Sequence, residues 1–474
     1  MRRFWIFLVF TLPFLSCQEH LIIDELIKDR EEDETEVTEV DEPDSTGSNP
    51  NCECDFIIES DNESYVFDGA LENVQPGDLV CIKPSNIKSI IFKNINGSAN
   101  NYVTIQNCGG QVVLGGPNVN NGILFLASRY FRLSGTGDVD NQYGIKIVET
   151  QMGTQGIAAT GLSSDIEMDH IEIHNAGYTG IMIKTDPSCD NDNALRPNFT
   201  LYNVELHDLY IHDLSGEGIY LGNSFYTGTT VYCNTQKYPH DVKNVRIYNN
   251  KFENTGREAI QVGGATEDVE VYDNEIYNYG TGNVSSQNGG IQFGKGTTGK
   301  LYNNYIENGS GAAVVIQGIG ENYIFNNVIV NAGYVSVNVN TRPTPLDSDI
   351  VPKGFLGGVY VMNNHLINPA HVAVNEYINE APNNVFYNNL IVTDKSKWQE
   401  LRTDTDWVLS NNLVINSIDE AGFVDPANGD YRLKNGSPAI GIGMDVSAYS
   451  VDFDFDGKQR TNNSWDIGAF SYNH

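Results

Sequence analysis

The stretch "VRIYNNKFENTGREAIQV" at residues 245–262 combines short runs of alternating apolar residues with an Asn-Asn pair and a Gly turn. Alternation with a period of two places successive side chains on opposite faces of a strand. Related copies of this unit occur at 166–183, 204–221, 269–278, 300–316, 323–339, 359–374, 384–392 and 407–415. Strands this short cannot form a core within one unit, but stacked units cover one another's apolar faces. The repeat therefore predicts an all-β solenoid.

The polar pair in each unit marks a bend between two strands. Asparagine tolerates the left-handed backbone that such a bend requires. Asn amides stacked from coil to coil can also donate and accept hydrogen bonds along the solenoid. The Asn-Asn pairs occupy 249–250, 303–304, 326–327, 363–364, 388–389 and 411–412. In this alignment, His170 and Asp208 take the position of the second Asn, which is Asn250 in the quoted unit.

These pairs and the "GI" strand starts at 180–181, 218–219 and 290–291 resemble the pectate-lyase-like superfamily, over roughly residues 65–415. The resemblance implies a right-handed parallel β-helix solenoid with Asn-rich bends, capped at both ends because an open coil exposes a strand edge. We expect the β-helix with its amino-terminal cap at 51–415 and a carboxy-terminal capping segment at 416–474. The alternative is another solenoid or a β-sandwich, although sandwich strands would not keep this period.

The amino terminus has the features of an export signal. A basic start precedes an apolar run at 4–15, which is too short to span a bilayer and fits a signal peptide. The run ends in "FLSC" at 14–17, which resembles the lipobox of bacterial lipoproteins, with Phe14 in place of the usual Leu. The resemblance implies that residues 1–17 are a lipoprotein signal peptide and that Cys17 carries lipid. Alternatively, the signal is cleaved in the ordinary way and Cys17 has no role.

Residues 18–50 are rich in Asp and Glu and poor in aromatic residues. Such a segment cannot bury enough apolar surface to fold, and its charges extend it. We expect a disordered acidic tether that holds the folded part away from a membrane. The chain would then be exported to the outer membrane or cell surface, and it would contact the membrane only through its lipid anchor.

The charge of the chain limits its partners. The 474 residues carry a formal net charge of -34 at pH 7. Nucleic-acid binding needs a basic face, so we exclude it. A neutral glycan is easier to hold than a polyanion, which would need a local basic cluster or bound cations. We expect a monomer with a polysaccharide as its partner.

The chain has seven cysteines, and the even number that remains after Cys17 permits disulfides in an exported protein. Two long insertions, at 185–199 and 223–241, leave neighbouring coils at the same point and contain one cysteine each. Because stacked coils lie about 4.8 Å apart, we predict a Cys189–Cys233 disulfide. The other pairing stays open between Cys81 with Cys108, and Cys52 or Cys54 with either of them.

Stacking also arranges polar residues of the three coils with long insertions in columns. The columns are His174, His212 and Glu253, then Glu172, Tyr210 and Lys251, and at the Gly turn Thr179, Glu217 and Glu258. Two carboxylates one coil apart can raise the pKa of one of them, which suits an acid–base pair. The candidate catalytic residues are Glu217, Glu258, His212, His240, His174, Arg257 and Lys184. Alternatively, the carboxylates cap turns or pair with the Arg and Lys, and the stacked histidines form a surface ladder.

The segment "YPHD" at 238–241, together with Glu258, resembles the catalytic coil of mannuronan C5-epimerases. In that family an Asp-Pro-His-acid motif precedes a strand, and an acidic residue follows at the next Gly turn. The matching residues here are Pro239, His240, Asp241 and Glu258, and Tyr238 stands where the family has its first Asp.

The epimerase resemblance implies a reaction that removes a proton beside a uronate carboxylate. The residues that would act on this proton are His240, Glu258 and either Tyr232 or Tyr238. Lys184 or Arg257 would neutralise the uronate. A lyase would take the same first step and then expel the neighbouring sugar.

Aromatic side chains near the insertions are candidates for stacking on sugar rings. They are Tyr178, Tyr220, Phe225 and Tyr226. Our first hypothesis is an exported enzyme that acts on a polysaccharide as a lyase, epimerase or hydrolase. The second is a non-catalytic glycan-binding or adhesive surface protein on the same scaffold, since one fold serves many functions.

The motif "DFDFDG" places Asp452, Asp454 and Asp456 at alternating positions before Gly457. This spacing resembles the start of a calcium-binding loop with oxygen ligands, but its twelfth position is Asn463 rather than Glu. Calcium is therefore the one cofactor that the sequence suggests. The alternative is an acidic turn in the terminal segment.

Overall fold

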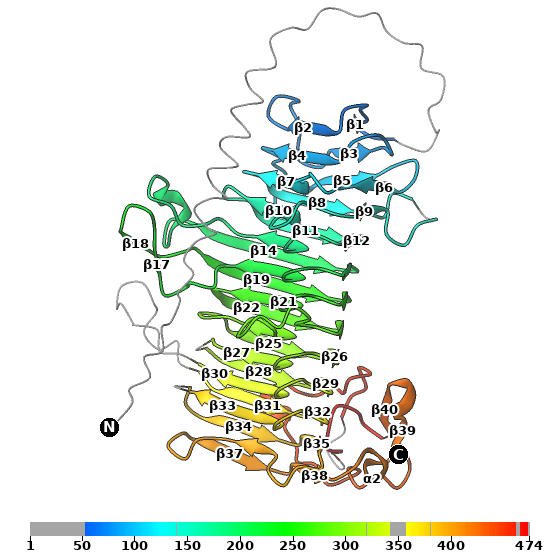
Figure 1. Ribbon diagram of the computed structural model, residues 1–474, viewed down its shortest axis with the longest axis vertical. Helices are drawn as coiled ribbons and strands as arrows, with labels where there is room; N and C mark the ends of the chain where they lie inside the picture. Colours follow the sequence, from blue (N-terminus) through cyan, green and yellow to red (C-terminus); the bar gives the residue numbers. More distant parts are fainter. Residues whose placement is uncertain are drawn as a thin grey trace, which may run out of the picture.

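The computed structural model describes residues 53–138, 140–318, 320–341, 357–379, 381–460 and 465–472. Its short strands stack on one another along the longest axis of the molecule (Figure 1). The expected signal peptide, with Cys17, and the expected acidic tether lie outside these residues. Within the described ranges, no helix combines the length and the apolar character that a bilayer crossing requires.

Three parallel sheets, which we name A, B and C, form the sides of the solenoid. In the described residues, sheet A has 13 strands. They are β1 (Phe56–Ile58), β3 (Leu79–Ile82), β5 (Val103–Asn107), β8 (Arg129–Ser134), β11 (Ser164–Asp169), β14 (Thr200–His207), β19 (Asp241–Tyr248), β22 (Ala265–Tyr272), β25 (Gly299–Tyr302), β28 (Asn322–Phe325), β31 (Val359–Met362), β34 (Asn384–Tyr387) and β37 (Trp407–Ser410).

Sheets B and C complete each coil. Sheet B contains β2 (Ser64–Asp68), β4 (Ser89–Lys93), β7 (Asn121–Leu126), β10 (Gln155–Thr160), β13 (Ile181–Ile183), β16 (Ile219–Gly222), β21 (Ile260–Gly263), β24 (Ile291–Phe293), β27 (Val314–Ile316), β30 (Val337–Asn340), β33 (Val374–Ile378) and β36 (Gln399–Glu400). Sheet C contains β6 (Val112–Leu114), β9 (Ile145–Ile147), β12 (Ile171–His174), β15 (Tyr210–His212), β20 (Lys251–Glu253), β23 (Glu275–Tyr277), β26 (Tyr305–Glu307), β29 (Val328–Val330), β32 (His365–Ile367), β35 (Leu390–Val392) and β38 (Leu413–Ile415). The chain passes from sheet A to C to B in each full coil, which confirms the predicted parallel β-helix.

The interior of the helix is filled by the inward-facing residues of the alternating strands. In one coil, Ile247 of sheet A, Phe252 of sheet C and Ile260 of sheet B each have 0% of their surface exposed. Strands of adjacent coils pair in register, for example Ile247 with Val271. The result is a continuous apolar stack, in which full burial of each large side chain contributes about 1.5–3 kcal/mol.

The two residues of each Asn pair have different roles. The first has a left-handed backbone, with φ of 54° at both Asn249 and Asn303. The second is buried and bonds to the next coil, since Asn250 Nδ2 donates to Asn274 Oδ1 over 3.0 Å and Asn274 Nδ2 donates to Asn304 Oδ1 over 2.9 Å. The ladder continues through Asn327, Asn364, Asn389 and Asn412, with links of 2.9 or 3.0 Å.

The ladder amides also bind the backbone on both sides. Asn304 Nδ2 donates to the carbonyl of Val271 in the preceding coil over 3.0 Å. The backbone N–H of Asn304 donates to Asn327 Oδ1 over 3.0 Å. One side chain therefore fixes the register of three successive coils.

Two earlier coils depart from the predicted alignment by one residue. Strand register places Asp208 opposite Asn249 rather than Asn250, and its backbone is left-handed with φ of 53°. Leu209 takes the ladder position, and its N–H donates to Asn250 Oδ1 over 3.0 Å. His170 is likewise a first-position residue, with φ of 54°. The ladder therefore begins at Asn250.

The amino-terminal coils are joined by a disulfide between Cys54 and Cys81, whose Cα atoms lie 6.0 Å apart. This bond settles one of the open alternatives and excludes Cys81–Cys108. Cys108 is also disulfide-bonded, and Cys52 lies outside the described residues.

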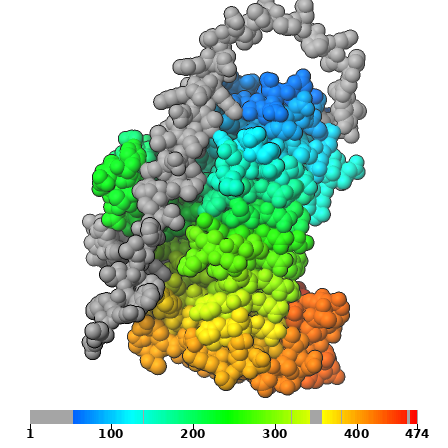
Figure 2. Space-filling model, viewed as in Figure 1, coloured from blue at the N-terminus to red at the C-terminus, as the bar shows by residue number. Residues whose placement is uncertain are grey.

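The described part of the carboxy-terminal segment, residues 416–460 and 465–472, lies beside the last coils (Figures 1 and 2). Its regular elements are α2 (Ile418–Ala421), β39 (Phe423–Asp425) and β40 (Asp430–Leu433). Val328 and Leu390 of sheet C form one buried cluster with Phe423 and Tyr431 of this segment. Sheet C is therefore covered from β29 onward.

First-position asparagines hold the same segment from the bend between sheets A and C. Asn326 Nδ2 donates to the carbonyl of Phe453 over 2.6 Å. Asn388 Nδ2 donates to the carbonyl of Met444 over 2.7 Å, and Asn388 Oδ1 accepts from the N–H of Met444 over 2.9 Å. In these pairs, the second asparagine thus bonds to the neighbouring coil inside the solenoid, and the first bonds to the carboxy-terminal segment.

Replacing Asn304 by Ala is expected to lower the free energy of unfolding by about 3 kcal/mol or more, because it leaves several buried backbone and amide groups without partners. The matched control is Asn62→Ala at an exposed position, with an expected change below about 0.5 kcal/mol. Denaturant unfolding of the two variants measures the difference. Equal effects would show that the ladder does not stabilise the coils.

Candidate functional site

The candidate catalytic residues occupy three separate places on the solenoid. His212 lies on the outer face of sheet C, Glu258 precedes β21 at the corner between sheets C and B, and His240 precedes β19 where the chain enters sheet A. Among the described residues, no hydrogen bond or ion pair joins any two of these three side chains. These three side chains therefore do not form one linked constellation, because each position of the repeat points in its own direction.

The histidine column lies on sheet C as predicted. Strand register pairs His174 with His212 and His212 with Glu253, and the two imidazole rings stack with centroids 5.0 Å apart. His212 Nε2 lies 3.3 Å from Glu172 Oε1, and its Nδ1 lies 2.7 Å from Asp213 Oδ2. Both ring nitrogens of His212 therefore face carboxylates, as in the surface ladder that the sequence left as an alternative.

His240 is a structural residue at the base of the long loops. It has 0% of its surface exposed, and burial lowers its pKa to about 4. Its Nδ1–H donates to the carbonyl of Asp241 over 2.9 Å, and its Nε2 accepts from the N–H of Thr185 over 3.2 Å. Both nitrogens are engaged, so this neutral imidazole has no free site for a substrate proton.

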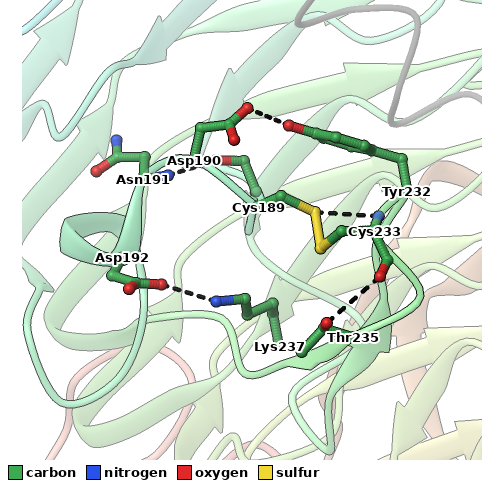
Figure 3. Close-up of a disulfide and its surroundings, with 9 residues drawn as sticks. Cys189, Asp190, Asn191, Asp192, Tyr232, Cys233, Thr235 and Lys237 are labelled. Atoms are coloured by element: carbon green, nitrogen blue, oxygen red, sulfur yellow. Dashed lines mark hydrogen bonds and ion pairs between the residues drawn. A yellow bond between two sulfur atoms is a disulfide. The ribbon is translucent and has the colours of Figure 1, made fainter.

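The two long loops are joined as the sequence predicts. The Cys189–Cys233 disulfide has its Cα atoms 6.1 Å apart (Figure 3). The Tyr232 hydroxyl donates to Asp190, beside the disulfide. The second loop also contains a short hairpin, formed by β17 (Thr229–Thr230) and β18 (Gln236–Lys237). The loops therefore form one cross-linked unit beside sheet B.

A buried arginine packs the inside of this loop unit. The Arg196 guanidinium lies 3.7 Å from the ring centroid of Tyr226, and its Nη1 lies 3.7 Å from Asp241 Oδ1. Tyr226 is only 2% exposed, so its prediction as a sugar-stacking residue is wrong, because the ring packs against this guanidinium. Phe225, with 55% of its surface exposed, remains accessible.

Glu217 is buried in a polar cluster at the corner between sheets C and B. Its carboxylate accepts hydrogen bonds from Thr179 Oγ1 over 3.2 Å and from the Tyr178 hydroxyl over 3.3 Å. Arg257 Nη1 lies 3.4 Å from Glu217 Oε1 and donates to the Tyr178 hydroxyl over 2.8 Å. This carboxylate is fully partnered.

Glu258 occupies the same column one coil further and has a different environment. It is 0% exposed, and neither carboxylate oxygen has a hydrogen-bond partner among the described residues. Burial raises its pKa to about 8. The backbone N–H of Glu258 itself and the charge of Arg257 oppose the rise, and the charge of Glu217 adds to it. At the next coil a Cβ on Gly289 would lie 3.8 Å from Glu258 Cγ, so this glycine leaves space beside the side chain. Glu258 is thus a buried carboxyl that stays protonated at neutral pH.

Beside this corner, the outer face of sheet B carries a chain of polar contacts. Lys184 Nζ lies 4.9 Å from the Tyr220 ring centroid and 3.1 Å from Asp186 Oδ2. The Tyr220 hydroxyl and Gln261 Nε2 both bond to Ser224 Oγ, over 2.9 and 2.7 Å. These contacts connect the loop unit to the sheet.

Sequence reasoning missed Ser224, Gln261 and Gln292 in this network. Gln292 Nε2 donates to Gln261 Oε1 over 3.2 Å. Strand register pairs Tyr220 with Gln261 and Gln261 with Gln292. Extending the repeat alignment by one further column would have found both glutamines, whereas Ser224 lies in a loop without periodicity.

The "DFDFDG" segment forms a turn closed by its own backbone. Asp454 Oδ1 accepts from the N–H groups of Asp456 and Lys458 over 3.0 and 2.8 Å, and its Oδ2 accepts from the N–H of Ser471 over 2.7 Å. Asp456 Oδ2 lies 3.1 Å from Lys458 Nζ. These contacts fit the acidic turn and do not gather the Asp452, Asp454 and Asp456 carboxylates around one ion.

One further group has the residue types of a metal site. Ligand atoms of Glu167, Asp169 and His207 all lie within 4.8 Å of one another. Arg132 Nε lies 3.0 Å from Glu167 Oε1 and 2.7 Å from Asp169 Oδ2. The guanidinium therefore neutralises the position that a cation would take.

Comparison with known proteins identifies no family. No family model and no curated protein matches the chain. Solved structures that resemble it include an alginate lyase from Paenibacillus sp. str. FPU-7, with 15% identity over 74% of this chain and 99% of the other and a TM-score of 0.37.

Two further structures cover more of the chain at similarly low identity. Pectate lyase Pel9A has 14% identity over 85% of this chain and 90% of its own, with a TM-score of 0.40. A complex of XylC with xylose has 11% identity over 85% of this chain and 94% of its own, with a TM-score of 0.44. Similarities of this size assign neither site residues nor a substrate to this chain.

Proposed function

We propose that this protein acts on an extended polysaccharide that lies along the outer face of sheet B, with Glu258 and Glu217 as its acid–base pair. The observation that carries the proposal is the state of Glu258. A buried carboxyl without partners costs stability, and such groups concentrate at functional sites. Small residues can occupy this column without burying a polar group, as Gly289 and Ala312 do in later coils.

The two carboxyl groups have environments that suit different roles. Glu258 is protonated at neutral pH because burial raises its pKa to about 8. Glu217 accepts from Arg257 and two hydroxyl groups. Pairs of carboxyl groups in different environments are typical of acid–base catalysis. In this proposal Glu258 donates a proton, and Glu217 accepts one after Arg257 has moved toward the substrate.

The outer face of sheet B offers contacts for a sugar chain. Tyr220 and the exposed Phe225 provide aromatic faces, whereas the buried Gln261 amide is held by Ser224 and Gln292. Lys184 and Arg257 supply positive charge for a uronate carboxylate. A uronate would favour the lyase or epimerase reaction, in which a proton beside that carboxylate is removed, and a neutral sugar would favour hydrolysis. A stacked solenoid face suits an extended polymer.

A non-catalytic glycan-binding or adhesive role is the second candidate, and a specific observation favours it. Glu258 and Glu217 are only 0% and 1% exposed. In the enzyme proposal, a substrate carboxylate must draw Arg257, whose side chain is 24% exposed, away from this cluster before the proton can move. The binding role requires no such opening.

We also propose that the protein is exported, as a monomer that does not bind nucleic acid. Two disulfides, Cys54–Cys81 and Cys189–Cys233, support an oxidising compartment. In this proposal the signal peptide is removed by cleavage before Cys17, Cys17 carries the lipid anchor as the first mature residue, and the acidic tether spans 18–50. The β-helix at 51–415 and the capping segment at 416–474 follow.

Glu258→Gln is expected to abolish turnover, by about 100-fold or more, because Gln keeps the size of the side chain but cannot exchange a proton. A panel of uronate and neutral polysaccharides is assayed for unsaturated ends and for reducing sugars. The matched control is Glu72→Gln at an exposed position, which should keep full activity. Binding without turnover on every polymer would reject the enzyme and favour the binding role.

The titration of Glu258 has a separate consequence for stability. Folding raises the pKa of Glu258 from the ordinary 4.5 to about 8. The contribution of the protonated Glu258 to the free energy of unfolding is therefore fully present below pH 4.5 and is lost as the pH rises through 8. The free energy of unfolding of Glu258→Gln, measured relative to wild type, should therefore be higher at pH 8.5 than at pH 4.5, by at most about 4–5 kcal/mol. Denaturant unfolding of wild type and variant at both pH values measures this, and an identical difference at the two pH values would contradict a raised pKa.

A further inference from the structure

The outer face of sheet C changes character between β26 and β29. Strands β20, β23 and β26 present Tyr, Glu and Lys side chains outward. Strands β29, β32 and β35 lie under the carboxy-terminal segment and present apolar side chains together with the buried His365. At this border a cleft of about 530 Å³ opens between the sheet and residues 426–431 of the segment.

Three tyrosine rings line this cleft from two different elements. Tyr277 and Tyr305 lie on the neighbouring strands β23 and β26, with ring centroids 5.6 Å apart. Tyr431 of β40 faces Tyr305 from the carboxy-terminal segment at 6.4 Å. Gly429, with φ of 80°, brings the segment close, since a Cβ there would lie 3.6 Å from the Tyr305 hydroxyl. The cleft is therefore held by both the solenoid and its cap.

The polar groups of the cleft are mainly hydrogen-bond acceptors. The Tyr305 hydroxyl donates to Glu307 Oε2 over 2.8 Å, and the Tyr277 hydroxyl donates to Glu275 Oε2 over 3.3 Å. No lysine or arginine is among the described residues that line it. Lys251 lies 5.9 Å from the Tyr277 ring centroid but is paired with Glu253 over 2.8 Å. Anionic sugars are therefore disfavoured.

We propose that this cleft binds a neutral, hydroxyl-rich glycan. Aromatic rings match the apolar faces of sugar rings, while carboxylates accept hydrogen bonds from sugar hydroxyls. The site is separate from the sheet B face, where Lys184 and Arg257 supply positive charge. It does not depend on catalysis there, and it gives the protein a second contact with a glycan.

The experiment measures binding of cellohexaose, xylohexaose and mannohexaose to the folded protein by calorimetry at 0.5 M NaCl, which screens charge (Debye length about 4 Å). Wild type should bind at least one of them. Tyr277→Ala and Tyr305→Ala should each weaken that binding by about 10-fold or more. Tyr305→Phe, which keeps the ring, should stay within about 3-fold of wild type. Glu307→Gln should also weaken binding, and it provides a second test if Tyr305→Ala does not fold.

Two variants outside the cleft serve as controls. Tyr377→Ala removes a tyrosine of sheet B that is 63% exposed, and Glu258→Gln alters the proposed catalytic corner. Both should bind the hexaose as wild type does. The proposal is overturned if no neutral hexaose binds, if binding survives both tyrosine-to-alanine changes, or if only a charged hexaose of glucosamine or galacturonate binds. Loss of binding in the two controls alone would place the glycan on sheet B and leave the catalytic proposal intact.

Discussion

The buried asparagine ladder is the constraint on which the rest of the structure depends. Each ladder amide bonds to the next asparagine and to a backbone carbonyl of the preceding coil. These groups are buried, so a slip in register would leave donors and acceptors unpaired at several coils at once. Since the ladder fixes how coil lies on coil, it also fixes which distant residues become neighbours. Glu217 and Glu258 meet for this reason.

The periodic part of the molecule could be predicted from sequence because its physics is periodic. Alternating residues, the Asn bends and the His174–His212 column all follow from one repeat and appear in the strand register. The one-residue error at Asp208 arose where an Asp-Leu pair replaces the asparagines, so the alignment lost its marker. The Cys189–Cys233 pair was predictable because both loops leave aligned strands.

The predictions that failed concern residues outside the repeat. His240 and Tyr226 lie in the loop unit, where packing around Arg196 and Thr185 decides burial. The sequence also could not assign each candidate residue to one outer face of the solenoid, because residues that are close in sequence can lie on different sheets of the same coil. The mixed set of histidines and carboxylates therefore divides into a sheet C ladder and a corner cluster. The cleft beside Tyr305 could not be predicted from the sequence, because it forms only when the carboxy-terminal segment packs on sheet C.

The central claim is that buried Asn side chains lock the coils in register, and hydrogen exchange of Asn side-chain amides tests it most directly. By NMR, the Nδ2 protons of Asn274, Asn304 and Asn327 should exchange only through large-scale opening, because they are buried and doubly bonded. Those of the exposed Asn254 and Asn278 should exchange rapidly. Rapid exchange at both sets of asparagines would contradict a continuous ladder and, with it, the stacking that brings Glu217 and Glu258 together.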